Sequence, residues 1–192
     1  MDFKIQVATD AHLKYAGEIC TTIEHSAKQR GTGIAKRDLQ YIEQKIHTGN
    51  AVIALLENTF VGFCYIETWE HGKYVANSGL IVTLDFRGNG LAKKIKTLAF
   101  QHAQNKFPNA KVFGITTSLP VMKINSSLGY QPVTFSELPK DDVFWKSCES
   151  CPNFDILARN DRKMCLCTGM LAPSKNEMEH DLTYLTSVKK QS

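Results

Sequence analysis

The fold of this chain is decided by the stretch Gly79-Leu80-Ile81-Val82-Thr83-Leu84-Asp85-Phe86-Arg87-Gly88-Asn89-Gly90-Leu91-Ala92. Its first half is apolar and predicts a buried strand, and the helix that follows has one apolar face. Between them, Gly88 and Gly90 let the main chain approach a ligand without a Cβ in the way. The first N–H groups of a helix lack intrahelical acceptors and lie at the positive end of its dipole, so this loop is suited to bind an anion.

The loop differs from two other phosphate-binding loops that contain glycine. It lacks the Lys-Ser/Thr ending of a nucleoside triphosphate loop and the longer glycine spacing of the dinucleotide fingerprint. A glycine pair before a helix is often only a turn, but this pair follows an apolar strand and opens an amphipathic helix. Arg87, Lys93 and Lys94 add positive charge. We therefore expect the loop to hold a pyrophosphate group.

Outside this stretch, hydrophobic periodicity predicts an α+β protein with the order β-α-α-β-β-β-α-β-α-β and one later strand. Strands are expected at residues 3–8, 51–56, 60–68, 74–84, 111–116, 130–135 and 163–171. Helices are expected at residues 10–28, 39–49, 90–106 and 121–128, and the glycines at 31 and 33 are expected to break the first helix. The third helix, at residues 90–106, then crosses between the strands at 74–84 and 111–116.

Length and composition fit one globular domain. The chain has 192 residues, of which 43% are hydrophobic and 22% charged. A chain of this size can bury most of its apolar surface. We expect a single domain over residues 1–172, which includes a cysteine-rich segment at 145–171, and a loose polar tail at 173–192.

The charge pattern and the amino terminus exclude several classes of function. A formal net charge of +4 is spread along the chain, which is too weak for a nucleic-acid footprint but suits a small polyanionic ligand. The first residues do not resemble a signal peptide, and the longest apolar run, Ala51 to Leu56, is too short to span a bilayer. We expect a cytoplasmic protein with no nucleic-acid and no membrane partner, whose six cysteines are thiols or metal ligands.

The motif Arg87-x-x-Gly90-x-Ala92 resembles the acyl-CoA motif Gln/Arg-x-x-Gly-x-Gly/Ala of the GNAT (GCN5-related N-acetyltransferase) superfamily. The resemblance extends over roughly residues 3 to 135 in the order of elements. It implies a mixed, mostly antiparallel sheet with helices on both faces and two splayed strands that form an acyl-CoA cleft. It also implies direct acyl transfer from the thioester to an amine, without a covalent enzyme intermediate.

The resemblance implies which residues bind the acyl-CoA. In this family the strand before the loop bulges and offers backbone groups to the pantetheine arm, and the loop holds the pyrophosphate. In the helix after the fifth strand, members often carry an Asn and, later, a Tyr that protonates the leaving thiolate. The implied cofactor-binding residues of this chain are Leu80, Ile81, Val82, Arg87, Gly88, Asn89, Gly90, Leu91, Ala92, Ser118 and Asn125.

This chain departs from the family at the tyrosine. Alignment of Leu128-Gly129-Tyr130 with the usual Leu-Gly-Phe ending places Ser118 at the Asn position and Asn125 at the Tyr position. The usual acid is therefore missing, because an amide has no proton to give at neutral pH. Asn125 can still hydrogen-bond the sulfur or the pantetheine, and Tyr130 is expected in the core.

The acceptor amine must lose a proton before it attacks, so a base is expected near the splayed strands. Glu67, Glu70 and His71 cluster at the end of a predicted strand and are the candidates. The alternative is that they form a solvated turn.

A narrower resemblance concerns the acyltransferase domain of bacterial N-acetylglutamate synthases. It is carried by residues 114–117, which read Gly-Ile-Thr-Thr, by 128–133 and by Leu138-Pro139. The resemblance implies that Thr116 and Thr117 meet a substrate carboxylate. The alternative is that they are ordinary β-branched strand residues.

The carboxyl-terminal part contains two pairs of cysteines, Cys148-x-x-Cys151 and Cys165-x-Cys167. This spacing is compatible with a structural zinc site of four thiolates. Because the second pair falls in the last predicted strand, alternation would point both thiols to one face. The alternative is four reduced cysteines, of which the second pair is packed as small apolar groups.

These observations predict an acyl-CoA-dependent N-acyltransferase that acts on a small amine, with an amino acid such as glutamate as the first acceptor to test. Two alternatives stay open: a protein-lysine or N-terminal acetyltransferase, and a CoA-binding sensor or interaction module without turnover. Acetyl-CoA or another acyl-CoA is the expected co-substrate, one structural zinc ion is an open question, and so is a homodimer.

Overall fold

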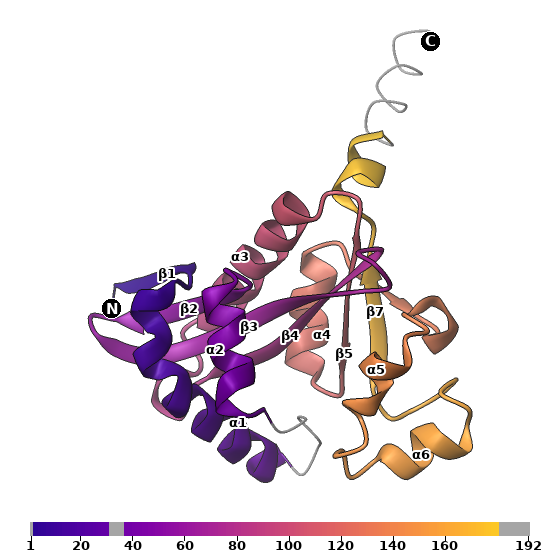
Figure 1. Cartoon of the computed structure of the whole chain (residues 1–192), viewed down its shortest axis with the longest axis horizontal. Coiled ribbons are helices and arrows are strands. Elements are labelled where there is room, and N and C mark those ends of the chain that lie inside the picture. The colour runs from indigo at the N-terminus through magenta and orange to yellow at the C-terminus, as the bar shows by residue number, and fades with distance from the viewer. Residues whose placement is uncertain (1, 31–36, 181–192) are drawn as a thin grey trace, which may run out of the picture.

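The computed structural model of the chain describes residues 2–30 and 37–180. Its centre is a seven-stranded sheet with the strand order β1-β2-β3-β4-β5-β7-β6 (Figure 1). Among these described strands, β4 and β5 pair in parallel and all other neighbours pair antiparallel, as predicted. The strands are β1 (Phe3–Val7), β2 (Ala51–Leu56), β3 (Thr59–Trp69), β4 (Tyr74–Val82), β5 (Lys111–Thr116), β6 (Gln131–Val133) and β7 (Thr168–Ala172).

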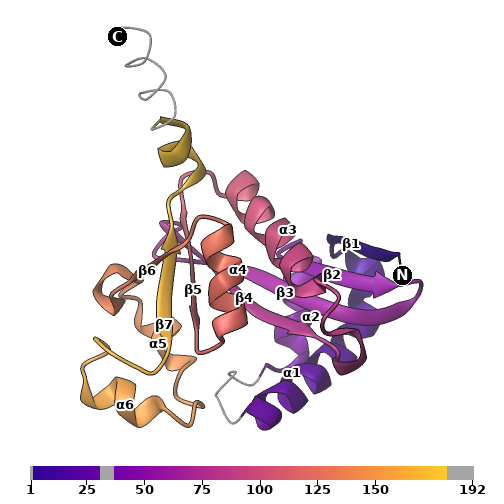
Figure 2. The ribbon, with the colours of Figure 1, turned by 180° about the vertical axis from the view of Figure 1, so that it is seen from behind.

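Helices cover both faces of this sheet. On one face lie α1 (Ala16–Arg30) and α2 (Leu39–His47), and on the other lie α3 (Leu91–Lys106) and α4 (Leu119–Ser127), which the reverse view shows in front (Figure 2). Helix α3 is the predicted crossover between β4 and its parallel neighbour β5. The short helices α5 (Asp142–Lys146) and α6 (Phe154–Arg159) lie near β7. Within the described ranges, no helix has the length and apolar character needed to cross a bilayer.

The core is divided by the sheet, because successive residues of a strand point to opposite faces. In β2, Val52 and Ala54 face α3, whereas Ala51 and Ile53 face α1 and α2. Both faces are covered, and this explains why β2 reads as a continuous apolar run rather than an alternating one. A third cluster, built around the aromatic residues of α5 and the preceding segment, packs on Ala76 of β4.

Several ends differ from the sequence prediction. The first helix opens with a 3₁₀ helix at Asp10–Tyr15, and the predicted glycine break lies in 31–36, outside the described residues. The last strand begins at Thr168 rather than at residue 163, so Cys165 and Cys167 precede it, and the argument that alternation orients their thiols was wrong. Helices α5 and α6 were not predicted, because each has fewer than two full turns in which a periodic pattern can appear.

Residues 175–180 are helical, although the sequence suggested a loose tail from residue 173. Ser174 and Glu177 form a reciprocal cap: the Glu177 N–H donates to Ser174 Oγ at 3.2 Å, and the Ser174 N–H donates to Glu177 Oε2 at 2.7 Å. Such a capping box satisfies two N–H groups that a helix start leaves free.

Candidate functional site

The parallel strands β4 and β5 stay together only over their first residues. Three pairs form the ladder, Tyr74↔Lys111, Val75↔Val112 and Ala76↔Phe113. The strands themselves continue to Val82 and Thr116. Beyond the third pair they part, which is the splay that the sequence led us to expect.

A bulge in β4 accompanies the separation. The register between β3 and β4 shifts after Phe63, where Tyr65 pairs with Ser78 and Phe63 pairs with Ile81. Gly79, in the extra segment, has a φ of +67°, and a Cβ at this position would lie 2.3 Å from Cε1 of Tyr65. Both the backbone angle and the ring therefore require glycine here.

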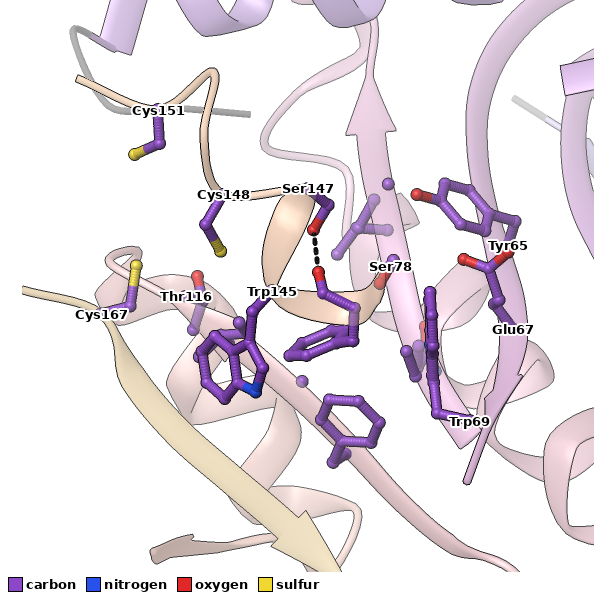
Figure 3. Close-up of a pocket in the computed structure, with 18 of the residues that line it drawn as sticks. Tyr65, Glu67, Trp69, Ser78, Thr116, Trp145, Ser147, Cys148, Cys151 and Cys167 are labelled. Carbon is purple, nitrogen blue, oxygen red and sulfur yellow. Dashed lines mark hydrogen bonds between the residues drawn. The ribbon is translucent and has the colours of Figure 1, made fainter. Parts of the chain in front are cut away.

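The splayed strands open into a cleft of about 600 Å³. Its lining comes from both faces of the sheet: Tyr65 and Glu67 belong to the face of α1 and α2, while Lys96 and Asn125 belong to the face of α3 and α4. Figure 3 shows Tyr65, Glu67 and Trp69 on one side and Trp145, Ser147 and Cys148 across from them. The cleft thus joins the two faces at the place where β4 leaves β5.

Glu67 is held on the wall of the cleft by two partners from α2. Its Oε2 accepts a hydrogen bond from the Tyr41 hydroxyl at 2.6 Å, and its Oε1 forms an ion pair with the Lys45 ammonium. Arg37 lies beside this pair and donates from Nε to the Tyr65 hydroxyl at 2.7 Å. Burial raises the pKa of Tyr65, so this phenol stays protonated near neutrality.

Glu70 and His71 lie apart from Glu67. Both are in the turn between β3 and β4 with positive φ values, 48° and 54°. Neither lines the cleft, and Glu70 accepts a hydrogen bond from the backbone N–H of Lys140. Of the three candidate bases, the structure brings Glu67 alone to the cleft.

The glycine loop is exposed and open at the start of α3. Gly88 and Gly90 have φ values of +85° and +70°, and within the described structure no atom lies within 4 Å of a Cβ built at either position. Arg87 links the loop to β4 and α1. Its Nε donates to the Val82 carbonyl oxygen at 3.1 Å, and its Nη2 donates to Ser26 Oγ at 3.3 Å. The Asn89 side chain donates to the Phe86 carbonyl oxygen at 3.2 Å. Residues 87–90 are exposed, and the first N–H groups of a helix have no intrahelical acceptors.

The strand residues before the loop fall into two groups. Leu80 lines the cleft. The side chains of Ile81 and Val82 are buried in the apolar clusters on opposite faces of the sheet. Neither side chain is therefore open to a ligand, and the Val82 carbonyl oxygen accepts from Arg87 Nε. That the backbone of this strand binds a pantetheine arm stays a prediction.

A buried polar cluster lies at the point where β4 leaves β5. The Lys96 side chain from α3 reaches it, and Lys96 is 2% exposed. Its Nζ donates to the Asn77 carbonyl oxygen at 3.0 Å. A Cβ built on Gly114 of β5 would lie 3.5 Å from this oxygen, 3.9 Å from Asn125 Nδ2 and 4.0 Å from Lys96 Nζ. The Asn77 carbonyl, the Asn125 amide and the Lys96 ammonium therefore lie around the Cβ position of Gly114, where β4 and β5 part.

The cluster contains polar atoms without partners. In the described part of the chain, Asn77 Nδ2, Asn125 Oδ1 and the Tyr130 hydroxyl are buried and have no hydrogen-bond partner. Burial lowers the pKa of Lys96, which the neighbouring Cys64 thiol partly opposes. Tyr130 is buried as expected, at 0% exposure, and Asn125 is also buried, at 1%.

Sequence reasoning missed Lys96. A signal was present, because Lys96 lies three residues before Ala99, four before Phe100 and seven before Ala103, which puts a lysine within the apolar stripe of an amphipathic helix. A charged residue in such a stripe is almost never fully buried unless it has a partner or a function.

Thr116 is the last residue of β5, and Thr117 and Ser118 follow it. Thr116 lines the cleft, whereas Thr117 is exposed and does not. Thr116 Oγ1 accepts a hydrogen bond from the Ser118 N–H at 3.0 Å. Ser118 precedes the first turn of α4, but its side chain makes no capping hydrogen bond.

The four cysteines of the carboxyl-terminal segment line the far end of the same cleft. Figure 3 shows Cys148, Cys151 and Cys167 there. Within the described residues, no three His, Cys, Asp or Glu side chains lie close enough together to hold a metal ion. Burial raises the pKa of Cys167 to about 12 and also raises that of Cys148. The arrangement therefore does not support the zinc site suggested by the spacing, and the raised pKa values keep the Cys148 and Cys167 thiols protonated near neutrality.

Comparison with known proteins agrees with this geometry. Residues 36–120 match the acetyltransferase (GNAT) family, and no curated protein matches the chain significantly. N-acetylglutamate synthase from Neisseria gonorrhoeae, solved with coenzyme A and N-acetyl-glutamate, has a similar fold with a TM-score of 0.63 and 13% identity. The match covers 91% of this chain but 35% of that one, so this chain spans about a third of the Neisseria enzyme.

Two other solved structures are similar over almost their whole length. Rv2747 from Mycobacterium tuberculosis, in complex with CoA and NLQ, has a TM-score of 0.62 and 15% identity, and the match covers 88% of this chain and 98% of that one. A chain of the NatC complex bound to Gag peptide and CoA has a TM-score of 0.61 and 11% identity, with 90% and 99% covered. At these identities the likeness establishes the fold. Together with the family match, it confirms the predicted resemblance to GNAT acetyltransferases.

Proposed function

We propose that this protein transfers an acyl group, in the first instance acetyl, from coenzyme A to the amine of a small molecule. The observation that carries the proposal is the cleft between β4 and β5, which begins where the parallel ladder ends and is accompanied by the Gly79 bulge. β4 then leads through a short 3₁₀ turn to the glycine loop. One strand thus connects a cleft for a reacting group with an anion site for its phosphates.

The donor binds along β4. Its pyrophosphate is held by the N–H groups of the loop Arg87 to Ala92, where the φ values of Gly88 and Gly90 leave the approach open. The backbone from Leu80 to Val82 bonds the pantetheine arm, which enters the gap between the two strands. Asn125 of α4 lines the cleft, which supports its assignment to the sulfur end of the donor, and Ser118 precedes the first turn of the same helix.

The acceptor enters from the face that carries Tyr41, Tyr65 and Glu67. Glu67 is the base, because it is the one of the three candidates that lines the cleft, and the other carboxylate there, Asp38, caps α2 by accepting from the Tyr41 N–H. It takes the proton of the amine directly or through a water molecule. The neighbouring Lys45 and Tyr41 keep its carboxylate oriented toward the cleft wall.

An amino acid such as glutamate is the first acceptor to test. Thr116 lines the cleft and offers a hydroxyl to a substrate carboxylate, whereas the exposed position of Thr117 makes a direct role less suitable. The likeness to N-acetylglutamate synthase supports this choice of first test.

A protein or peptide acceptor is the second candidate. A chain of the peptide-bound NatC complex has nearly the same TM-score as the small-molecule enzyme, so the fold alone does not choose between acceptors. A CoA-binding module without turnover is the remaining alternative, and it is motivated by Asn125 at the position of the family's acid.

An acceptor screen with thiol detection tests the proposal. The protein is mixed with acetyl-CoA and either amino acids, polyamines or short peptides, and released CoA is recorded. Release with an amino acid or another small amine supports the proposal, and release with peptides alone supports the second candidate. Tight binding of acetyl-CoA with no CoA release for any acceptor would support the remaining alternative, a CoA-binding module without turnover.

A further inference from the structure

The buried ammonium of Lys96 has more N–H donors than it has acceptors in the described structure. An ammonium has three N–H donors, and in the described structure its one hydrogen-bond acceptor is the Asn77 carbonyl oxygen at 3.0 Å. The Tyr130 ring lies 5.9 Å away and adds a weak cation–π contact. No carboxylate of the described residues forms an ion pair with it. A cation buried in this way is costly unless something else satisfies it.

The free donors face the gap in the sheet. Lys96 lines the cleft together with Gly114 and Asn125. Gly114 has no side chain, so no β5 atom occupies the position that a Cβ would take there. That position lies within 4.0 Å of both Lys96 Nζ and Asn125 Nδ2. A group that enters between β4 and β5 therefore meets the Lys96 ammonium at the inner end of its path.

Ionisable side chains line the cleft on both faces of the sheet, and Arg37 and Asp38 lie on the same side as Glu67. The Glu67 carboxylate lines it on the face of α2, and the Lys96 ammonium lines it on the face of α3. Acyl transfer to an amine needs a proton acceptor for the amine and a proton donor for the leaving group. The two charges lie on the sides that such a division of roles requires.

We propose that Lys96 is the catalytic acid of the transfer, and that its ammonium bonds the thioester sulfur and protonates the departing thiolate of CoA. This inference rests on the acyl-CoA-dependent transfer proposed above. The amine nitrogen forms a bond to the acyl carbon while the carbon–sulfur bond breaks, and the sulfur keeps the bonding pair. One Lys96 proton passes to sulfur to give the CoA thiol, the acceptor's proton passes to Glu67, and solvent later restores both groups.

Two titratable groups face Lys96 from neighbouring elements. They are the Cys64 thiol of β3 and the phenol of Tyr130, and burial raises the pKa of each. Both therefore stay neutral in the range where Lys96 loses its proton. Since burial lowers the pKa of Lys96 from its ordinary value, the rate should fall on the alkaline side as the ammonium is lost.

Kinetics with an isosteric, uncharged variant test the role. We expect Lys96→Met to lower kcat with acetyl-CoA by about 100-fold, to leave the KM for the acceptor nearly unchanged and to remove the alkaline fall in rate. Lys123→Met, which removes an exposed lysine from α4, is the matched control and should behave as wild type. An unchanged kcat in a folded Lys96→Met protein would overturn the proposal, as would an acetyl adduct on Lys96 itself after incubation with acetyl-CoA.

A binding experiment separates this inference from the proposed function, because it needs no turnover. An ammonium at the sulfur should lower the pKa of the bound CoA thiol, which the ultraviolet absorbance of the thiolate reports for the wild-type protein. Wild type should also bind CoA about tenfold more tightly than desulfo-CoA at a pH where the thiolate forms, and Lys96→Met should lose this preference. A bound thiol that titrates as in free CoA, with equal affinity for desulfo-CoA, would refute the role of Lys96. Failure to bind either ligand would instead refute the CoA site.

Discussion

The Nζ atom of Lys96 lies 3.0 Å from the carbonyl oxygen of Asn77, and Asn77 is the first β4 residue after the ladder with β5 ends. The hydrogen bond links the crossover helix α3 to the point where the sheet divides. The carbonyl is satisfied without a β5 N–H, so the strands can part without leaving this buried oxygen unpaired. The same contact places the ammonium in the cleft.

Gly90→Val should abolish acyl-CoA binding and leave the fold intact. The Cβ finds open space within the protein, but it would stand where phosphate must approach, and the φ of +70° would cost about 1–2 kcal/mol for a branched residue. Gly72→Val is the matched control, because Gly72 has a φ of +84° and equally open surroundings in a distant turn. Calorimetry should show at least a tenfold loss of CoA affinity in the first variant alone, an order-of-magnitude expectation from the loss of backbone contacts. Unchanged affinity in a folded Gly90→Val protein would contradict the assigned loop.

Gly79→Ala should destabilise the protein and weaken donor binding together. A methyl group there would lie 2.3 Å from the Tyr65 ring, and the positive φ is unfavourable for alanine. We expect a loss of about 1–3 kcal/mol in the free energy of unfolding, measured by urea denaturation. Calorimetry should show weaker CoA binding, because the bulge that separates β4 from β5 would relax. A variant as stable as wild type with equal CoA affinity would show that the bulge does not depend on Gly79.

Glu67→Gln should lower kcat by about 100-fold and flatten the rise of rate with pH, because an amide cannot accept the proton of the amine. Glu70→Gln and His71→Asn should keep the wild-type profile, since neither side chain lines the cleft. Circular dichroism checks that loss of the ion pair with Lys45 does not unfold the first variant. If all three proteins keep the wild-type pH–rate profile, the amine loses its proton by another route.

Cys167 should react slowly with iodoacetamide in the native protein. Its pKa is raised to about 12 by burial, and the thiolate is the reactive form, so alkylation near neutral pH should be at least 100-fold slower than in urea, by order of magnitude. Mass spectrometry of tag-free, chelator-treated protein measures the rate at this site. About one equivalent of bound zinc, whose removal unfolds the segment and exposes all four cysteines, would contradict the thiol assignment.

Local patterns in the sequence were enough for much of the architecture. The strand, the glycine turn and the helix start at residues 79–92 were predicted correctly, because turn geometry and apolar periodicity are properties of neighbouring residues, and the anion site there stays a prediction. The central strands β2, β4 and β5 and the crossover helix α3 were found nearly at their observed bounds for the same reason. The short helices α5 and α6 and the late start of β7 were missed, since their positions depend on the aromatic cluster on which they pack.

Only the tertiary structure decided which side chains share the cleft. Glu67, Glu70 and His71 are close in sequence, but a positive-φ turn carries the last two away from the cleft while α2 holds the first. Lys96 and Asn77 are 19 residues apart and meet because the crossover helix returns across the sheet. The register between strands and the path of a crossover are set by packing over long distances, whereas the sequence pattern reports only which face of each element is apolar.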